Sequence, residues 1–227
     1  MKERTVIIND KPFTYRDEID DISYESIKPI TEAQAKVLLD TTQKLFDQVG
    51  LNLYLAFGTL LGAVRSQGII PGDEDVDVFT DDEDLLRENL QLFQDKGLNL
   101  VRLSKGSVYS FKTNDNAYID VYILRKLKLS IWSLYCYHLD RYNTPKKYFR
   151  SYEQIEFLGG TYLCPSAPEQ ILEFWYGKDW RTPVKGHEFL YEVKSAYYWK
   201  KYTAKLKYFI QRMIGWYHWR HLVKKVD

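Results

Sequence analysis

The most informative segment of the chain runs from residue 57 to residue 78 and reads FGTLLGAVRSQGIIPGDEDVDV. A Gly58-Thr59 turn follows a short apolar run, and a brief predicted helix comes after it. Further along, Asp75 and Asp77 alternate with valines, which is the period of a β-strand. Side chains two residues apart on a strand point to the same face, so the two carboxylates share one face and the valines face the core.

The acidic pair suits a divalent cation. Asp75 and Asp77 repel each other when held this close, and Mg²⁺ (or alternatively Mn²⁺) relieves that repulsion while also binding water and phosphate oxygens. Asp120 lies in a second strand-like run, Tyr118–Tyr122, as a lone acid among β-forming residues. A buried unpaired carboxylate is costly, so we expect Asp120 beside the pair, either as a third metal ligand or as a base for an attacking hydroxyl. Asp73 either joins the metal ligands or only caps the preceding turn.

Three residues that precede the acidic pair in the sequence, Gly58, Thr59 and Arg65, suit a bound phosphate. Gly58 lets the backbone approach closely, and Thr59 offers a hydroxyl where a helix begins, whose free N–H groups favour anions. Arg65 either neutralises phosphate charge or pairs with Asp73. An acidic pair taken alone is more often a solvated surface. Here the strand–helix–strand setting and the matching downstream acid favour a functional site.

Residues 58–65 (GTLLGAVR) together with residues 70–78 (IPGDEDVDV) resemble the signature of the LicD/fukutin family. The resemblance covers residues 31–125 and a patch near residues 168–183. It implies an α/β (α+β) nucleotidyltransferase fold like that of DNA polymerase β. In that fold a mixed central sheet is flanked by helices, and we expect a C-terminal helical extension.

Two positions depart from the family pattern. The family commonly has Trp where Gly72 stands and Asp where Glu74 stands. The first change removes an aromatic wall, which would alter the shape of a donor or acceptor site. The second should leave metal binding intact, because Glu74 points away from the face of the acidic pair if the strand has already begun.

The resemblance also implies an activity. It is the transfer of a phospho-alcohol, such as phosphocholine or ribitol phosphate, from a CDP-linked donor to a hydroxyl of a cell-surface glycan, which could be lipid-linked. In that mechanism Asp73, Asp75 and Asp77 hold the metal against the donor pyrophosphate, and Asp120 binds a second metal or takes the acceptor proton. The alternatives are a nucleotidyltransferase that releases pyrophosphate, and a catalytically silent protein that binds glycan or nucleotide.

Composition sets further bounds. The chain has 227 residues and a formal net charge of +1, which argues against a nucleic-acid partner. Its two cysteines, Cys136 and Cys164, have no partner at metal-ligand spacing. There is no signal-peptide pattern and no apolar run long enough to cross a bilayer, so we expect a cytoplasmic protein, or one peripheral to the inner face of the membrane.

The C-terminal part differs from the rest. We expect a catalytic domain over residues 1–189 and a basic, aromatic helical tail over residues 190–227, which holds nine Lys or Arg and two Asp or Glu. Such a helix suits a membrane interface. The alternative is that its aromatic residues pack on the catalytic domain while its lysines face water.

Local patterns predict the remaining elements. A Thr31/Gln34 capping box opens a helix that ends at Gly50, and a Ser166/Glu169 box opens another that ends at Gly177. The other expected elements are a hairpin around Asn9-Asp10, strands over 51–57, 98–103, 108–112 and 117–124, a helix over 85–93, and helical structure in the first part of 126–150.

Overall fold

A computed structural model describes residues 2–18, 28–104, 108–113, 117–125, 136–139, 142–183 and 212–213. The predicted tail therefore lies outside the described residues, apart from Arg212 and Met213. The first part of the segment over residues 126–150 also lies outside them.

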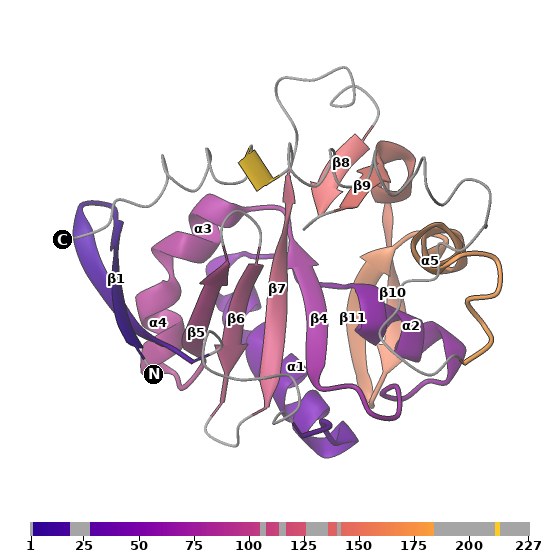
Figure 1. Cartoon of the computed structure of the whole chain (residues 1–227), viewed down its shortest axis with the longest axis horizontal. Helices are drawn as coiled ribbons and strands as arrows, with labels where there is room; N and C mark the ends of the chain where they lie inside the picture. Colours follow the sequence, from indigo (N-terminus) through magenta and orange to yellow (C-terminus); the bar gives the residue numbers. More distant parts are fainter. Residues whose placement is uncertain are drawn as a thin grey trace.

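A mixed β-sheet forms the centre of the molecule, in the order β10-β11-β3-β4-β7-β6-β5 (Figure 1). Its strands are β3 (Tyr54–Leu55), β4 (Asp75–Thr80), β5 (Asn99–Ser104), β6 (Val108–Lys112), β7 (Tyr118–Arg125), β10 (Tyr152–Phe157) and β11 (Gly160–Pro165). Strand β4 runs parallel to β7 and β11 parallel to β3, whereas the other neighbours are antiparallel. Two further strands, β8 (Cys136–Leu139) and β9 (Tyr142–Pro145), extend the end of β7. The predicted mixed sheet is confirmed.

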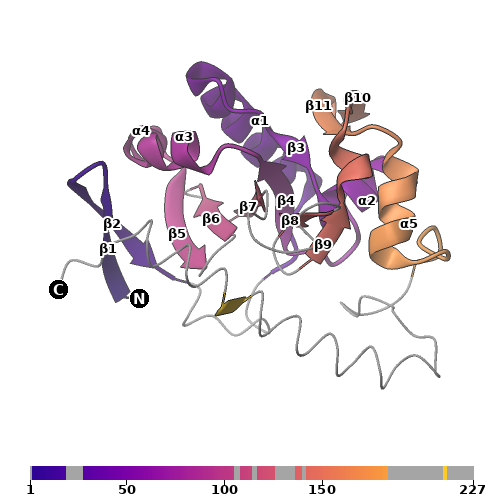
Figure 2. The same ribbon diagram turned by 90° about the horizontal axis from the view of Figure 1, so that it is seen from above.

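Helices cover one face and one end of this sheet. They are α1 (Glu32–Val49), α2 (Phe57–Arg65), α3 (Glu83–Glu88), α4 (Leu90–Asp95) and α5 (Pro168–Tyr176), with a 3-10 helix η4 (Lys146–Phe149). Figure 2 shows α1, α3 and α4 on the same face of the sheet. Helices α2 and α5 contact each other near the β10–β11 end of the sheet, where α2 contacts β10 and α5 contacts β11 (Figure 1). The valines of β4 are fully buried, so the core lies under the face that α1 covers.

The capping signals explain the bounds of α1. The Thr31 hydroxyl accepts a hydrogen bond from the Gln34 N–H, and the Gln34 side chain accepts one from the Thr31 N–H. This reciprocal pair satisfies two donors that a helix start otherwise leaves unpaired. Gly50 ends the helix with φ of 81°, a left-handed conformation that glycine adopts without a Cβ penalty. The predicted helix over residues 31–49 is confirmed.

The N-terminal hairpin is longer than predicted. It pairs β1 (Lys2–Ile8) with β2 (Lys11–Asp17) through a two-residue turn. Asn9 and Asp10 both have positive φ, as a type I′ turn requires, and these residue types tolerate it best after glycine. Beyond β2, the Glu18 N–H donates to the Val101 carbonyl at 3.0 Å, which ties the hairpin to strand β5.

Two predicted elements differ in detail. The strand over residues 51–57 pairs only at Tyr54–Leu55, because the chain already turns into α2 at Phe57. The helix over residues 85–93 is broken into α3 and α4 at Asn89, whose side-chain amide donates to the Leu85 carbonyl. Such side-chain bonds to the backbone compete with regular helix geometry.

The start of α5 also differs from the prediction. Its bounds follow the prediction, with Pro168 in the first turn and Gly177 at the end. The Ser166/Glu169 capping box is wrong, however. Ala167 is the residue that precedes the helix, and no side chain caps it. The Ala167 N–H instead donates to the Glu153 carboxylate across the β10–β11 hairpin, so a tertiary contact takes the place of the local cap.

The β10–β11 hairpin was not predicted from the sequence. Its two-residue turn, Leu158-Gly159, has positive φ at both positions. Leucine is an unusual residue in that conformation, so the turn lacks the Asn-Gly signal by which such hairpins are found. Strand β10 also carries exposed polar side chains, which hides its strand pattern.

Candidate active site

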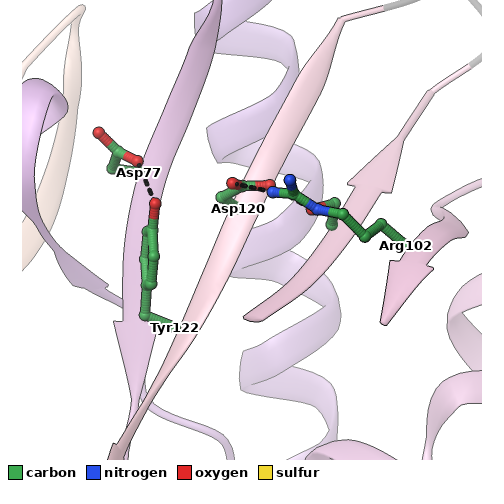
Figure 3. A network of polar contacts seen from close by, with 5 residues as sticks. Asp77, Arg102, Asp120 and Tyr122 are labelled. Atoms are coloured by element: carbon green, nitrogen blue, oxygen red, sulfur yellow. Dashed lines mark hydrogen bonds and ion pairs between the residues drawn. The ribbon is translucent and has the colours of Figure 1, made fainter. Parts of the chain in front are cut away.

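The three predicted acids of the site lie on two neighbouring parallel strands. In the register of β4 and β7, Asp77 is directly paired with Asp120, and Asp75 with Tyr118. Asp75 and Asp77 share the face of the sheet opposite to α1. Figure 3 shows the Asp77 and Asp120 side chains projecting from adjacent strands. The structure thus brings Asp120 beside the acidic pair, where the sequence placed it.

Asp73 reaches the same place from the loop before β4. The Ile30 N–H donates to its carbonyl at 2.8 Å, and its own N–H donates to the Ile70 carbonyl at 3.0 Å, so the loop is held at both ends. A Cβ placed on Gly58 would lie 2.9 Å from Asp73 Oδ2 and 3.1 Å from Asp77 Oδ2. The two carboxylates therefore converge on the backbone of Gly58, and a Cβ at this position would displace them.

Gly58 and Thr59 hold the acidic strand in this structure. The Gly58 N–H donates to Asp77 Oδ2 at 2.9 Å, and the buried Thr59 hydroxyl accepts from the Asp77 N–H at 2.8 Å. The Ala56 N–H donates to the Asp77 carbonyl at 3.1 Å. These bonds join the start of α2 to β4 and fix Asp77 at backbone and side chain. The sequence assigned Gly58 and Thr59 to phosphate binding, which stays a prediction.

The junction before α2 is strained and packed. Phe57 has φ of 35°, a left-handed conformation that costs free energy in a bulky residue. Its ring packs edge-on to Tyr122, with centroids 4.9 Å apart, and also contacts Trp175 of α5. Trp175 Nε1–H donates to the Thr144 hydroxyl at 3.1 Å, which links α5 to β9. Tertiary packing therefore holds the turn that presents Gly58 to the acids.

The structure adds three side chains that sequence reasoning missed. The Tyr122 hydroxyl donates to Asp77 Oδ1 at 3.1 Å. Arg102 Nη2 donates to Asp120 Oδ2 at 2.6 Å, and the Ser110 hydroxyl donates to Asp120 Oδ1. The only local signal was that Tyr122 lies two residues after Asp120 and so shares its face. Nothing local places Arg102 or Ser110 near the site.

The acids raise one another's pKa. Burial, together with the charges of Asp73 and Asp120, raises the pKa of Asp77 to about 8. Burial and the charge of Asp77 also raise the pKa of Asp75 well above its usual value. The bonds from Gly58 and Tyr122 offset part of this effect at Asp77. A site in this state gains from positive charge, because a cation relieves both the repulsion and the desolvation.

The donor set fits Mg²⁺. Among the residues that the structure describes, no three His, Cys, Asp or Glu side chains are already gathered as a complete metal site. Mg²⁺ does not need one, because it commonly takes one or two carboxylates and completes its octahedron with water and substrate phosphate. Asp73 and Asp77 each place an oxygen near one point beside Gly58, and Asp75 shares their face. Mn²⁺ accepts the same oxygen ligands.

Arg65 ends α2 and is partly buried. Within the described part of the chain it forms no ion pair, so the predicted pairing with Asp73 is not formed. Its phosphate role stays a prediction. Cys164 is a free, buried thiol whose pKa is raised by burial to about 12, as expected for an unreactive core cysteine. None of the described helices is both long and apolar enough to cross a membrane.

Residues 50–167 match the family model described as LicD/FKTN/FKRP, nucleotidyltransferase domain. The chain belongs to this family. The match spans the turn, the acidic strand and the β7 acid, so the predicted family and nucleotidyltransferase fold are confirmed.

Similar proteins found by sequence comparison are consistent with this family. The chain is similar to "Ribitol-5-phosphate transferase FKTN" from Homo sapiens, at 27% identity over 74% of this chain and 37% of that protein. The protein of the same name from Macaca fascicularis is 28% identical over 66% of this chain and 34% of its own length. The chain thus spans little more than a third of these relatives. Among solved structures, the lincosamide antibiotic adenylyltransferase LnuA aligns over 78% of this chain and 98% of its own, with 15% identity and a TM-score of 0.44.

Proposed function

We propose that this chain is a Mg²⁺-dependent transferase that moves a phospho-alcohol from a CDP-linked donor to a hydroxyl of a cell-surface glycan. Ribitol phosphate is the first candidate group, because relatives in the same family carry that name. Phosphocholine is the second. One observation carries the proposal: Asp77 and Asp120 are cross-strand partners next to Asp73, on a nucleotidyltransferase fold.

Asp73, Asp75 and Asp77 are the residues that would hold the metal. When bound there, Mg²⁺ would neutralise phosphate charge and polarise the phosphorus–oxygen bonds of the donor. Gly58 and Thr59 keep Asp77 in place through the bonds described above. Tyr122 adds a hydroxyl that holds the second oxygen of Asp77. Both oxygens of this ligand are thereby oriented before any substrate arrives, as preorganisation requires.

The proposed reaction needs no nucleophile from the protein, because the acceptor hydroxyl attacks the donor directly. The acceptor hydroxyl oxygen forms a bond to the phosphorus that bears the alcohol, the bond from that phosphorus to the bridging oxygen breaks, and CMP leaves. The hydroxyl proton goes to a base, for which Asp120 is the candidate. The bonds from Arg102 and Ser110 fix the orientation of the Asp120 carboxylate.

A donor screen tests the proposal. The chain is incubated with Mg²⁺, a glycan acceptor and, in turn, CDP-ribitol, CDP-choline, CDP-glycerol and the four NTPs, and released CMP and pyrophosphate are measured. CMP release from one CDP-alcohol, dependent on Mg²⁺ and lost in Asp77→Asn, is the expected result. Asp84→Asn is the matched control, because it removes one carboxylate from an exposed position on α3.

The other outcomes point elsewhere. Pyrophosphate release from an NTP would replace the proposal with nucleotidyl transfer. Nucleotide binding without turnover of any donor would favour a catalytically silent binding protein. Both results would overturn the proposal as stated.

A further inference from the structure

Four polar side chains form one row across the sheet, perpendicular to the strands. Asp77 on β4 is paired with Asp120 on β7, Asp120 with Ser110 on β6, and Ser110 with Arg102 on β5. Directly opposed residues project from the same face, so all four lie on the face of the acidic pair. Figure 3 shows Arg102 reaching toward Asp120. The row therefore begins at the proposed metal ligands and ends in a protein cation.

Arg102 belongs to this row because of a β-bulge. The pairing between β5 and β6 shifts between Leu100 and Arg102, so Val101 is an extra residue in β5. Regular pairing would set Val101 opposite Ser110 and turn Arg102 to the other face. The buried Val101 accepts the hydrogen bond from the Glu18 N–H at the end of the hairpin. The N-terminal hairpin thus supports the bulge that directs Arg102 to the site.

Arg102 and Ser110 together hold the whole Asp120 carboxylate. Arg102 Nη2 donates to Oδ2 at 2.6 Å, the Ser110 hydroxyl donates to Oδ1, and Arg102 Nε donates to the Ser110 oxygen at 2.8 Å. The three residues form a closed ring of hydrogen bonds drawn from three strands. The Asp120 and Ser110 side chains are buried and Arg102 is largely so. Buried charges persist only when paired in this way.

We propose that Arg102 is a positioning residue and the resident cation of this acidic site. It holds Asp120, so the chain takes one divalent cation, at the Asp73–Asp77 end, and no second cation at Asp120. This inference rests on the proposed function for the metal that it invokes. A guanidinium cannot lose its charge in a protein, so a second cation at Asp120 would have to displace or repel it.

Counting bound metal tests the inference without any turnover. The full chain is dialysed to equilibrium against Mn²⁺, alone and with CDP, and bound Mn²⁺ per chain is measured. We expect one Mn²⁺ in the wild type and in Asp120→Asn. Asp77→Asn should weaken binding at least about tenfold, which is the lower end of the cost of losing a ligand's hydrogen-bond partner. Arg102→Met should admit a second Mn²⁺, whereas Arg102→Lys, which keeps the charge, should not.

The control is a second arginine–carboxylate pair on the other side of the sheet. Arg125 Nη2 binds both oxygens of Glu83 at 2.5 and 2.6 Å. Arg125→Met should leave one Mn²⁺ per chain, because this pair does not touch the acidic face. Thermal melts followed by circular dichroism check that each variant folds. If Arg102→Met does not fold, the comparison of wild type with Asp120→Asn still decides the test.

Three results would overturn the inference. They are two Mn²⁺ in the wild type that fall to one in Asp120→Asn, no bound Mn²⁺ at all, and an Arg102→Met chain with unchanged stoichiometry and affinity. The proposed function is judged separately. One Mn²⁺ per chain without transfer from any CDP-alcohol would contradict the proposed function and support the role of Arg102. Transfer by a wild-type chain that binds two Mn²⁺ would support the proposed function and contradict the role of Arg102.

Discussion

The two faces of strands β4 and β7 carry opposite kinds of residue. One face presents Asp77 and Asp120, whose charges raise the cost of ionising Asp77 when no metal is bound. The other presents fully buried apolar side chains, among them Val78 and Ile119. We infer from this difference that the same two strands separate stability from the proposed function. The apolar face supplies free energy of folding, and the polar face uses part of it to hold carboxylates together.

The sharpest way to test this division is Asp77→Asn. We expect transfer activity to fall by about 10³-fold or more, the upper range for removing one group that stabilises transition-state charge. The metal-free fold should remain intact, because a neutral amide ends the repulsion with Asp73 and Asp120. Activity is measured by CMP release, and folding by urea denaturation. Near-normal activity would remove Asp77 from the mechanism.

The complementary change is Ile119→Ala on the opposite face, one residue before Asp120. It removes a fully buried side chain, so we expect unfolding free energy to fall by about 2–5 kcal/mol. The affinity of the folded chain for Mn²⁺ should be unchanged, because no metal-site contact is lost. Urea denaturation and Mn²⁺ titration below the unfolding transition give the two quantities. A large loss of affinity would show that the faces are not independent.

Gly58→Ala tests the close approach of the α2 backbone to the Asp73 and Asp77 carboxylates. The new Cβ would press on the Asp73 and Asp77 carboxylates at 2.9 and 3.1 Å, closer than such atoms normally approach. Side chains can yield, so we expect a small change in stability and a loss of Mn²⁺ affinity of about tenfold. Gly97→Ala is not a suitable control, because Gly97 has positive φ. Ala63→Gly, at the far end of the same helix, should leave affinity unchanged.

A dependence of stability on pH tests the same repulsion between the acids. The pKa of Asp77 is about 8 in the folded chain and near 3.8 when unfolded, so the folded state binds more protons between these values. Stability of the metal-free chain should therefore fall as pH rises from about 4 to 8. Mg²⁺ should reverse this trend at the upper end, since it binds the ionised form. Thermal melts across that range, with Asp77→Asn as the comparison, measure the contribution; an identical pH profile in the variant would contradict it.

Much of the site followed from the sequence because it is local. Residue spacing alone set Asp75 and Asp77 on one face of β4, and a capping box bounded α1. These features depend on backbone geometry within a few residues, which the side chains themselves specify. The lone acid in β7 also indicated its position, because an isolated buried carboxylate needs a nearby partner.

Tertiary structure decided the rest. The register of β4 against β7 set Asp120 opposite Asp77, and a bulge turned Arg102 onto the same face. Packing around Phe57 gave Gly58 and Thr59 their bonds to Asp77. Register and bulges depend on residues far apart along the chain, and a shift of one residue reverses the face of every side chain. Residue spacing therefore identified the acids, and only the assembled sheet showed which cation holds one of them.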